Sequence, residues 1–341
     1  MTISSDTLQR VSSALNAKAI VDTELIQPLW SGYGELFRAG LSYCDQPSVI
    51  VKHIKLPQPS SHPRGWSGAF SHQRKLRSYE VEVNWYRHYA NVLYPAGSDT
   101  DRVCPMPKCL HVEQSSDDIL LILEDLATLG FDEIIEQPSL AEIRLCLKWL
   151  AHFHAHHMQR PPDKLWDCGT YWHLDTRPEE WTAMAEGELK QAASALDELL
   201  KQCRFQTLVH GDAKLANFVF SSDSKRVAAV DFQYVGQGCG MKDVMMLLSS
   251  TVPTEQCEAL CPELLDDYFR YLKQATAKRN AASSRPTIVF EDLEQAWRPL
   301  YCVAWADFQR FLIGWSPGHW KIHAYSEALT QQALALIDGH S

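Results

Sequence analysis

Two short polar segments carry the side chains best suited to chemistry. The first runs from His210 to Asn217 with the sequence HGDAKLAN, and the second is Asp231, fourteen residues beyond Asn217. An apolar, β-branched stretch precedes each segment, so we expect both to follow short strands. Carboxylate and amide oxygens are ligands that Mg²⁺ accepts together with nucleotide phosphates. The set therefore predicts phosphoryl transfer to a hydroxyl, a reaction that depends on positioning and charge neutralisation.

The residue types suggest separate roles within this set. Asn217 and Asp231 are candidates to supply metal-binding oxygens. Asp212 has no evident ion partner in the sequence, so it is free to accept a hydrogen bond from the attacking hydroxyl. We expect His210 to shape the loop through backbone hydrogen bonds rather than to exchange protons.

The order and spacing of these residues resemble a known superfamily. His-x-Asp-x-x-x-x-Asn over 210–217, followed by Val-Asp-Phe over 230–232, resembles the catalytic loop and metal-binding motif of the protein-kinase-like superfamily. His-Gly-Asp, rather than His-Arg-Asp, is similar to its aminoglycoside phosphotransferase and choline kinase branch. The triplet Asp-Phe-Gln over 231–233 further resembles the ecdysteroid-kinase-like (CHK kinase-like) group of small-molecule kinases.

The resemblance implies functions for the matching residues. Asp212, Lys214 and Asn217 would be catalytic, with Lys214 neutralising charge on the moving phosphoryl group. Asn217 and Asp231 would bind Mg²⁺, and the phosphoryl donor would be ATP. Lys52, in a β-branched strand over 48–54, matches the lysine that grips the nucleotide phosphates in this superfamily.

That lysine should form an ion pair with a glutamate on the next helix, where Glu82 and Glu80 compete. At about 100° per residue, Glu82 lies roughly 60° or less from the directions of Tyr79 and Tyr86. Glu80 points about 100° away on the other side of the helix. We therefore predict Glu82 as the partner of Lys52.

Two further segments match nucleotide-binding parts of the superfamily. Gly32 and Gly34, within Ser-Gly-Tyr-Gly over 31–34, occupy the place of the phosphate-covering loop. Glu124 and Leu126, within Leu-Glu-Asp-Leu over 123–126, resemble the hinge whose backbone holds adenine. The resemblance does not decide between ATP and GTP, because a hinge contacts the base through backbone groups.

The resemblance implies an α+β, two-lobed, protein-kinase-like fold. The predicted N-lobe, residues 1–125, contains an antiparallel sheet plus a helix and binds nucleotide. Residues 126–130 form the hinge, and a mainly helical C-lobe over 131–341 holds the catalytic loop and substrate site. Helices are expected from a capping box at Ser139 and Glu142 to about 158, and over 178–203, 254–278, 290–313 and 323–338. Pro299 should kink or split the fourth of these, and residues 57–71 should form a loop.

The acceptor is expected to be a small alcohol, with sterol-like, choline-like and sugar-like molecules as open alternatives. Gln233 replaces the glycine of protein kinases and no Ala-Pro-Glu follows, which argues against a protein substrate. The alternatives are a catalytically idle nucleotide-binding regulator, a protein kinase, and a metal-dependent hydrolase using the histidines at 152, 154, 156 and 157. Trp305 and Asp307 are candidates for the substrate pocket, although core packing is the simpler interpretation.

Composition limits the other partners. With 32 basic and 42 acidic residues the formal net charge is −10, which disfavours nucleic acid as a partner. No apolar run approaches the roughly 20 residues of a membrane-spanning helix, and no basic stretch followed by an apolar one opens the sequence. Ten cysteines without a C-x-x-C pair indicate reduced thiols, so we expect a cytoplasmic protein that does not bind membranes. The oligomeric state stays open.

Overall fold

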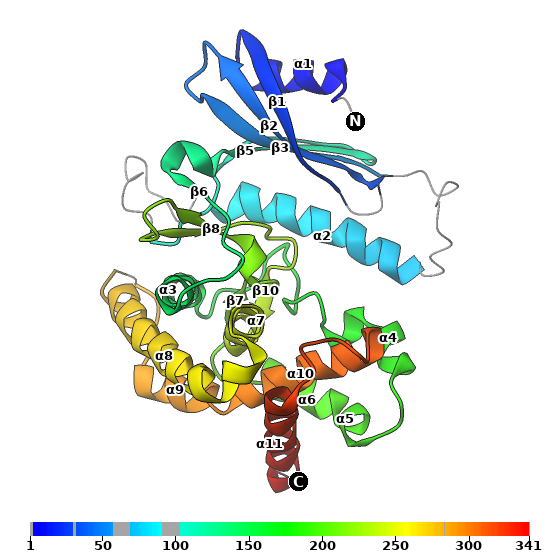
Figure 1. Cartoon of the computed structure of the whole chain (residues 1–341), viewed down its shortest axis with the longest axis vertical. Helices are drawn as coiled ribbons and strands as arrows, with labels where there is room; N and C mark the ends of the chain where they lie inside the picture. The colour runs from blue at the N-terminus through cyan, green and yellow to red at the C-terminus, as the bar shows by residue number, and fades with distance from the viewer. Residues whose placement is uncertain (1–2, 30–31, 57–68, 91–102, 283, 341) are drawn as a thin grey trace. The chain divides into compact units, whose positions relative to one another are not determined.

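The computed structural model describes residues 3–29, 32–56, 69–90, 103–282 and 284–340. The chain divides into two compact units, Met1–Glu133 with Ala228–Val230 and Ile134–Val227 with Asp231–Ser341. Figure 1 labels their helices and strands. Most of the loop predicted over 57–71, and Ser31 of the glycine segment, lie outside the described residues. The last part of that predicted loop is helical, because α2 begins at Ala69.

The first unit is built on a five-stranded antiparallel sheet in the order β1-β2-β3-β5-β4. Its strands are β1 (Ala19–Pro28), β2 (Gly34–Ser42), β3 (Ser48–Lys55), β4 (Cys109–Gln114) and β5 (Asp118–Glu124). Helix α1 (Ser5–Ala14) precedes the sheet, and α2 (Ala69–His88) follows β3. The 3-10 turn η3 (Leu126–Leu129) and the short β6 (Phe131–Glu133) follow β5.

Helices α1 and α2 pack on opposite faces of this sheet (Figure 1). Val49 and Val51 of β3 join the cluster that contains Val11 of α1, whereas Ile54 joins the cluster that contains Tyr79 of α2. Successive side chains in a strand point to opposite faces. Lys52 therefore shares the face of Ile54, which is the face that α2 covers.

The second unit is mainly helical, and its longer helices are α3 (Leu140–His157), α6 (Ala193–Lys201), α7 (Met241–Thr251), α8 (Cys257–Ala282), α10 (Leu300–Trp315) and α11 (Ala324–His340). Shorter helices and 3-10 turns are η4 (Leu174–Thr176), α4 (Pro178–Ala183), α5 (Glu188–Gln191), η5 (Leu215–Asn217), η6 (Thr254–Gln256) and α9 (Phe290–Trp297). Strands β7 (Thr207–Val209) and β10 (Gly236–Gly238) pair antiparallel beside the catalytic loop. Strands β8 (Phe218–Ser221) and β9 (Val227–Ala229) lie between the two polar segments.

The predicted fold class is confirmed: an α+β, two-lobed, kinase-like fold with an antiparallel N-terminal sheet and a mostly helical remainder. The capping box is present, because Ser139 Oγ accepts from Glu142 N at 3.3 Å and Glu142 Oε2 accepts from Ser139 N at 2.7 Å. The helix predicted over 290–313 divides at Pro299, as expected. The single helix predicted over 178–203 is wrong, because α4, α5 and α6 replace it and the extended Gly187 begins α5.

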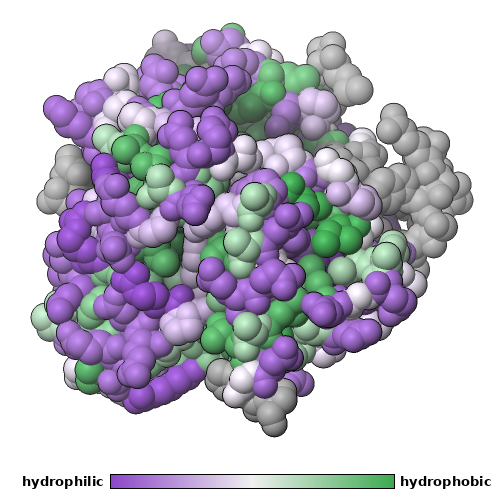
Figure 2. All heavy atoms as spheres, turned by 60° about the horizontal axis from the view of Figure 1, so that its bottom comes forward, coloured by the Kyte–Doolittle hydropathy of each residue, from purple (hydrophilic) through white to green (hydrophobic). Residues whose placement is uncertain are grey.

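Among the described residues, no helix combines the length and apolar character that crossing a membrane requires. Hydrophilic residues cover most of the face drawn in Figure 2, and hydrophobic residues appear there in separate patches.

Candidate active site

The predicted catalytic loop leaves β7 at Val209 and ends in the 3-10 turn η5. Within it, Asp212 Oδ2 accepts hydrogen bonds from Lys214 Nζ at 2.9 Å and from Asn217 Nδ2 at 3.1 Å. Asn217 Nδ2 also donates to the backbone oxygen of Asp212 at 2.7 Å. The other carboxylate oxygen, Asp212 Oδ1, is buried and makes no hydrogen bond with the described residues. It is therefore the oxygen that remains to accept a proton from a substrate.

Burial and charge act in opposition on this pair. Burial raises the pKa of Asp212, the positive charge of Lys214 opposes that rise, and the nearby Asp231 adds to it. Burial alone would lower the pKa of Lys214, but attraction to Asp212 outweighs this and leaves the pKa of Lys214 raised. The site thus combines a carboxylate of increased basicity with a lysine that stays charged.

Steric constraints require glycine in the middle of the His-Gly-Asp triplet. Gly211 has a φ of 81°, in the left-handed region where residues with a Cβ are strained. A Cβ at this position would lie 2.1 Å from the backbone oxygen of Tyr234 and 2.9 Å from the nitrogen of Thr170. An arginine, or any other residue with a Cβ, would therefore not fit this backbone at position 211.

Asp243, in the first turn of α7, holds the start of the loop in place. Its carboxylate accepts from the backbone N–H of His210 at 2.6 Å and of Gly211 at 2.9 Å. The same carboxylate contacts His154 Nε2 at 3.1 Å, and His154 Nδ1 contacts the hydroxyl of Tyr268 at 2.8 Å. Because a carboxylate only accepts, His154 carries its proton on Nε2. Asp243 braces the loop, and its side chain makes no hydrogen bond that caps α7.

These contacts also bear on the histidine-cluster hypothesis. His154 serves the brace, and burial lowers the pKa of His152 and His156 to about 4. In the described part of the chain, none of the four histidines belongs to a group of three metal-ligating side chains close enough to hold an ion. His210 has the loop-shaping contact expected of it, since its Nδ1 accepts from Asp212 N at 3.3 Å.

Oxygen donors suitable for Mg²⁺ come from both polar segments. The amide nitrogen of Asn217 is occupied by Asp212, and Asn217 Oδ1 makes no hydrogen bond with the described residues. Asp231 follows β9 with a φ of 66°, which is uncommon for a residue other than glycine. Such backbone strain persists where the surrounding structure enforces it and is concentrated at functional sites. An amide oxygen and a carboxylate are the hard donors that Mg²⁺ requires, so these residues fit the ion.

In the first unit, Lys52 and Glu82 form a buried bidentate ion pair. Lys52 Nζ lies 2.9 Å from Glu82 Oε1 and 2.7 Å from Oε2. Glu80 instead pairs with Arg77 at 2.8 Å on the exposed side of α2. The helical phase thus distinguished the two glutamates correctly.

The other nucleotide-binding candidates have mixed local roles. Gly34 has a φ of 138°, and a Cβ there would lie 1.9 Å from the backbone oxygen of His53, so the approach of β3 requires glycine. Gly32 has a φ of 75°, and a Cβ there would meet no described atom within 4 Å. Glu124 is paired with Lys108, through its own N–H at 2.9 Å and its Oε2 at 3.2 Å. The N–H of Leu126, at the start of η3, has no partner among the described residues and is available to a ligand.

A family comparison decides the class of protein. The model of the phosphotransferase enzyme family matches residues 50–282, which is more than half of the chain. The chain belongs to the phosphotransferase enzyme family. This assignment confirms the resemblance to the aminoglycoside phosphotransferase and choline kinase branch of the protein-kinase-like superfamily.

Solved structures similar to this phosphotransferase include three small-molecule kinases. Type VIII aminoglycoside-3'-phosphotransferase shares 16% identity over 89% of this chain and 98% of its own, with a TM-score of 0.46. A thermostable mutant of aminoglycoside phosphotransferase APH(4)-Ia, with ADP and hygromycin B, shares 10% identity over 98% of each chain, with a TM-score of 0.48. Choline kinase LicA from Streptococcus pneumoniae shares 12% identity over 97% of each chain, with a TM-score of 0.45. The comparison with curated proteins found no match.

Sequence reasoning missed a lysine of the phosphotransferase near this loop. Lys321 follows α10, is buried, and donates from Nζ to Ser249 Oγ at 3.0 Å. Burial lowers the pKa of Lys321 to about 8, while the charge of Asp212 raises it and that of Lys214 lowers it. Lys321 therefore belongs to the electrostatic environment of the catalytic pair. Only the folded chain reveals this, because more than a hundred residues separate Lys321 from Asp212.

The aromatic C-terminal candidates have structural roles. Asp307 is completely buried, accepts from Trp172 Nε1 at 3.0 Å and pairs with Arg310 at 2.8 Å. Trp305 is 1% exposed and packs against His323 and Tyr325. The interpretation of these residues as core, rather than pocket wall, agrees with this packing.

Proposed function

We propose that this phosphotransferase transfers the γ-phosphoryl group of ATP to a hydroxyl of a small molecule, by direct in-line displacement. The observation that carries the proposal is the loop geometry, where one buried carboxylate oxygen of Asp212 has no partner and the other is held by Lys214 and Asn217. Membership of the phosphotransferase family supports the same chemistry.

In the proposed reaction, the acceptor oxygen attacks the γ-phosphorus and the bond from that phosphorus to the β–γ bridging oxygen breaks. Asp212 Oδ1 orients the hydroxyl and takes its proton, and the burial that raises the pKa of Asp212 makes it a better base. Lys214 stabilises negative charge on the moving group. The products are a phosphate monoester and ADP.

The remaining residues bind the donor. Lys52, held in place by Glu82, would contact the α and β phosphates, and Asn217 with Asp231 would hold Mg²⁺. When bound, that ion neutralises charge on the phosphates. Gly32 and Gly34 would cover the phosphates, and the backbone at Glu124 and Leu126 would hold the base. Residues 1–125 then form the nucleotide-binding lobe, 126–130 the hinge and 131–341 the lobe with the substrate site.

The acceptor is a small alcohol, and the closer likeness to ecdysteroid-kinase-like enzymes stays a prediction. The segment after Asp231 favours a small molecule over a protein. Gln233 is buried and its backbone oxygen accepts from Trp166 Nε1 at 2.8 Å, and the chain enters α7 at Met241. Between Asp231 and α7 the chain is too short for a long protein-docking segment.

The test compares Asp212→Asn with Asp338→Asn, a variant of an exposed carboxylate on α11. Transfer from γ-labelled ATP to a panel of small alcohols is measured with nucleotide binding by calorimetry. We expect Asp212→Asn to lower the transfer rate by about 10²- to 10⁴-fold, the usual contribution of a positioned general base, with nearly unchanged nucleotide affinity. Asp338→Asn should match the wild type. Loss of nucleotide binding in folded Asp212→Asn would contradict the proposed role, and wild-type nucleotide binding without transfer would favour an idle regulator.

A further inference from the structure

Three metal-ligating side chains meet in the second unit, outside the residues assigned to phosphoryl transfer. Cys168 lies in the loop after α3, His173 directly precedes η4, and Asp197 lies on α6. One ligand atom from each, a sulfur, a nitrogen and an oxygen, lies within 4.8 Å of the other two. All three residues are buried. Within the described residues, this is the group of three close enough to share one ion.

Two of the ligand atoms lack hydrogen-bond partners. His173 Nε2 is 3.2 Å from Asp197 Oδ1, the distance of an ion pair when the imidazole is protonated, and neither atom has a well-aligned hydrogen bond in the described part of the chain. Buried polar atoms are nearly always satisfied, and an exception calls for an explanation such as an ion.

The separation of His173 Nε2 from Asp197 Oδ1 matches tetrahedral coordination. Bonds of about 2.0–2.1 Å to nitrogen and oxygen place two such ligands about 3.3 Å apart at a tetrahedral zinc ion, and a sulfur at 2.3 Å lies about 3.6 Å from either. The observed 3.2 Å between His173 Nε2 and Asp197 Oδ1 is close to the first value. One ion can therefore lie between these two atoms with little side-chain movement.

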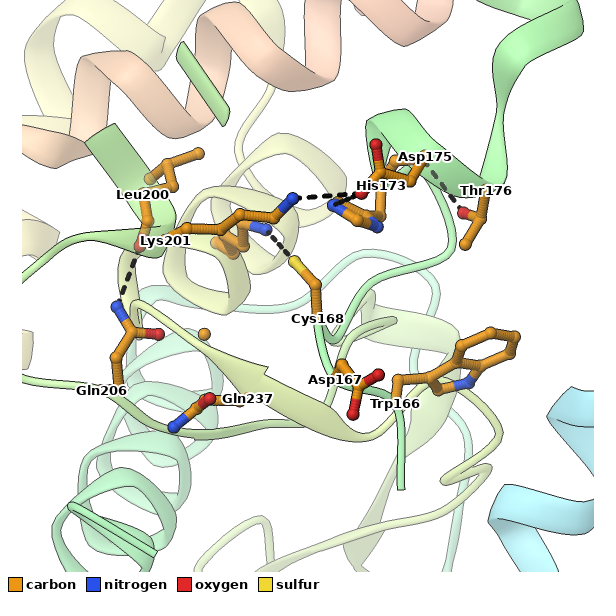
Figure 3. Close-up of a pocket in the computed structure, with 12 residues that line it drawn as sticks. Trp166, Asp167, Cys168, His173, Asp175, Thr176, Leu200, Lys201, Gln206 and Gln237 are labelled. Carbon is orange, nitrogen blue, oxygen red and sulfur yellow. Dashed lines mark hydrogen bonds and ion pairs between the residues drawn. The ribbon is translucent and has the colours of Figure 1, made fainter. Parts of the chain in front are cut away.

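The neighbouring lysines leave the ligand atoms available. Lys201 Nζ lies 2.7 Å from Asp197 Oδ2, so the carboxylate keeps Oδ1 for an ion. Lys242 Nζ lies 3.3 Å from Cys168 Sγ, where it favours a thiolate (Figure 3). Partners of this kind orient metal ligands from the outer shell.

A fourth position is also provided. Asp175 Oδ2 lies 3.7 Å from His173 Nε2 and 3.1 Å from Lys201 Nζ, and the side chain of Asp175 is mostly exposed. A cavity of about 440 Å³ is lined by Cys168, His173, Asp175 and Lys201, so water and ions have access (Figure 3).

We propose that Cys168, His173 and Asp197 bind a divalent transition-metal ion, zinc foremost, with Asp175 or a water molecule as fourth ligand. A thiolate and an imidazole exclude Mg²⁺, which prefers oxygen ligands, and favour zinc. The site is therefore distinct in chemistry from the one proposed for Asn217 and Asp231.

The site also has a connection to the catalytic loop. Lys242 touches Cys168, and the next residue, Asp243, accepts from the backbone of His210 and Gly211. A bound ion would hold the loop at 168–173 against α6, next to the residue that precedes Asp243. Its role is structural, and it takes no part in the proposed transfer of phosphate.

The test titrates metal-free, full-length protein with Co²⁺, which replaces zinc and reports thiolate ligation by a sulfur-to-metal charge-transfer band in the near ultraviolet. We expect the band to saturate at one equivalent and to disappear on addition of Zn²⁺, which should also raise the melting temperature. Cys168→Ser should lose the band, whereas Cys44→Ser, a half-buried thiol in the first unit, should retain it. Lys201→Met should weaken Co²⁺ binding by about 10- to 100-fold through its outer-shell contact.

Asp197→Asn is a second variant that tests the site if Cys168→Ser fails to fold. This variant keeps the thiol and should still weaken Co²⁺ binding. Absence of the band in folded wild-type protein would overturn the proposal. A band that persists in folded Cys168→Ser, or an affinity unchanged in folded Asp197→Asn, would overturn it as well. None of these readouts depends on phosphoryl transfer, so the two proposals fail separately.

Discussion

Gly211→Ala tests whether backbone geometry dictates the middle residue of His-Gly-Asp. The φ of 81° costs a residue with a Cβ about 1–2 kcal/mol relative to glycine. The Cβ would also lie 2.1 Å from the backbone oxygen of Tyr234, so backbone must move. Forced overpacking of this kind typically costs about 1–3 kcal/mol. Together these effects predict a loss of about 2–5 kcal/mol in the free energy of unfolding.

The assay is urea denaturation of Gly211→Ala beside Gly318→Ala. A Cβ on Gly318 would meet nothing within 4 Å, so its effect should stay within about 0.5 kcal/mol. Because Gly211 precedes Asp212, the transfer rate of Gly211→Ala should also fall in the fraction that remains folded. A loss under about 1 kcal/mol, or one equal to that of Gly318→Ala, would refute the steric explanation.

Three other variants test separate parts of the account. Asp243→Asn leaves one acceptor oxygen for the two backbone N–H groups of the catalytic loop. Both the free energy of unfolding, by about 1–3 kcal/mol, and kcat should therefore fall. Wild-type values of both would contradict the role of Asp243 in holding the loop. Lys52→Met, once its folding is verified, should weaken ATP binding measured by calorimetry at least tenfold. Lys55→Met, which changes an exposed lysine, is the control. Unchanged ATP affinity in Lys52→Met would mean that another cation binds the phosphates. Lys321→Met should stabilise the protein below pH 8 by up to about 3 kcal/mol, because the native pKa of about 8 lies below the unfolded value. That gain should shrink as pH rises above 8 and the wild type sheds its buried charge; a gain independent of pH would contradict the assignment.

Local patterns in the sequence predicted those features that neighbouring residues determine. The capping box at Ser139, the break at Pro299 and the choice of Glu82 over Glu80 each follow from steric or helical rules that act within a few residues. The one helix predicted over 178–203 is wrong because the extended Gly187 interrupts a pattern that is otherwise apolar and helical. Periodicity alone does not register such a break.

Features that depend on distant contacts were not accessible from the sequence. The catalytic motif located Asp212 and Asn217, but not the contribution of Lys321 to their electrostatics. Spacing gave no hint that Cys168, His173 and Asp197 converge, because loops and helices of irregular length separate them. The steric cause of Gly211 likewise needs the position of the backbone at residue 234.

Direct observation of the reaction products tests the central claim. The wild-type protein is incubated with ATP, Mg²⁺ and pooled small alcohols, and the mixture is followed by phosphorus NMR. The account predicts a new phosphate monoester resonance that grows in step with ADP and requires both Mg²⁺ and one acceptor. Release of inorganic phosphate alone, or no consumption of ATP with every class of acceptor, would contradict it.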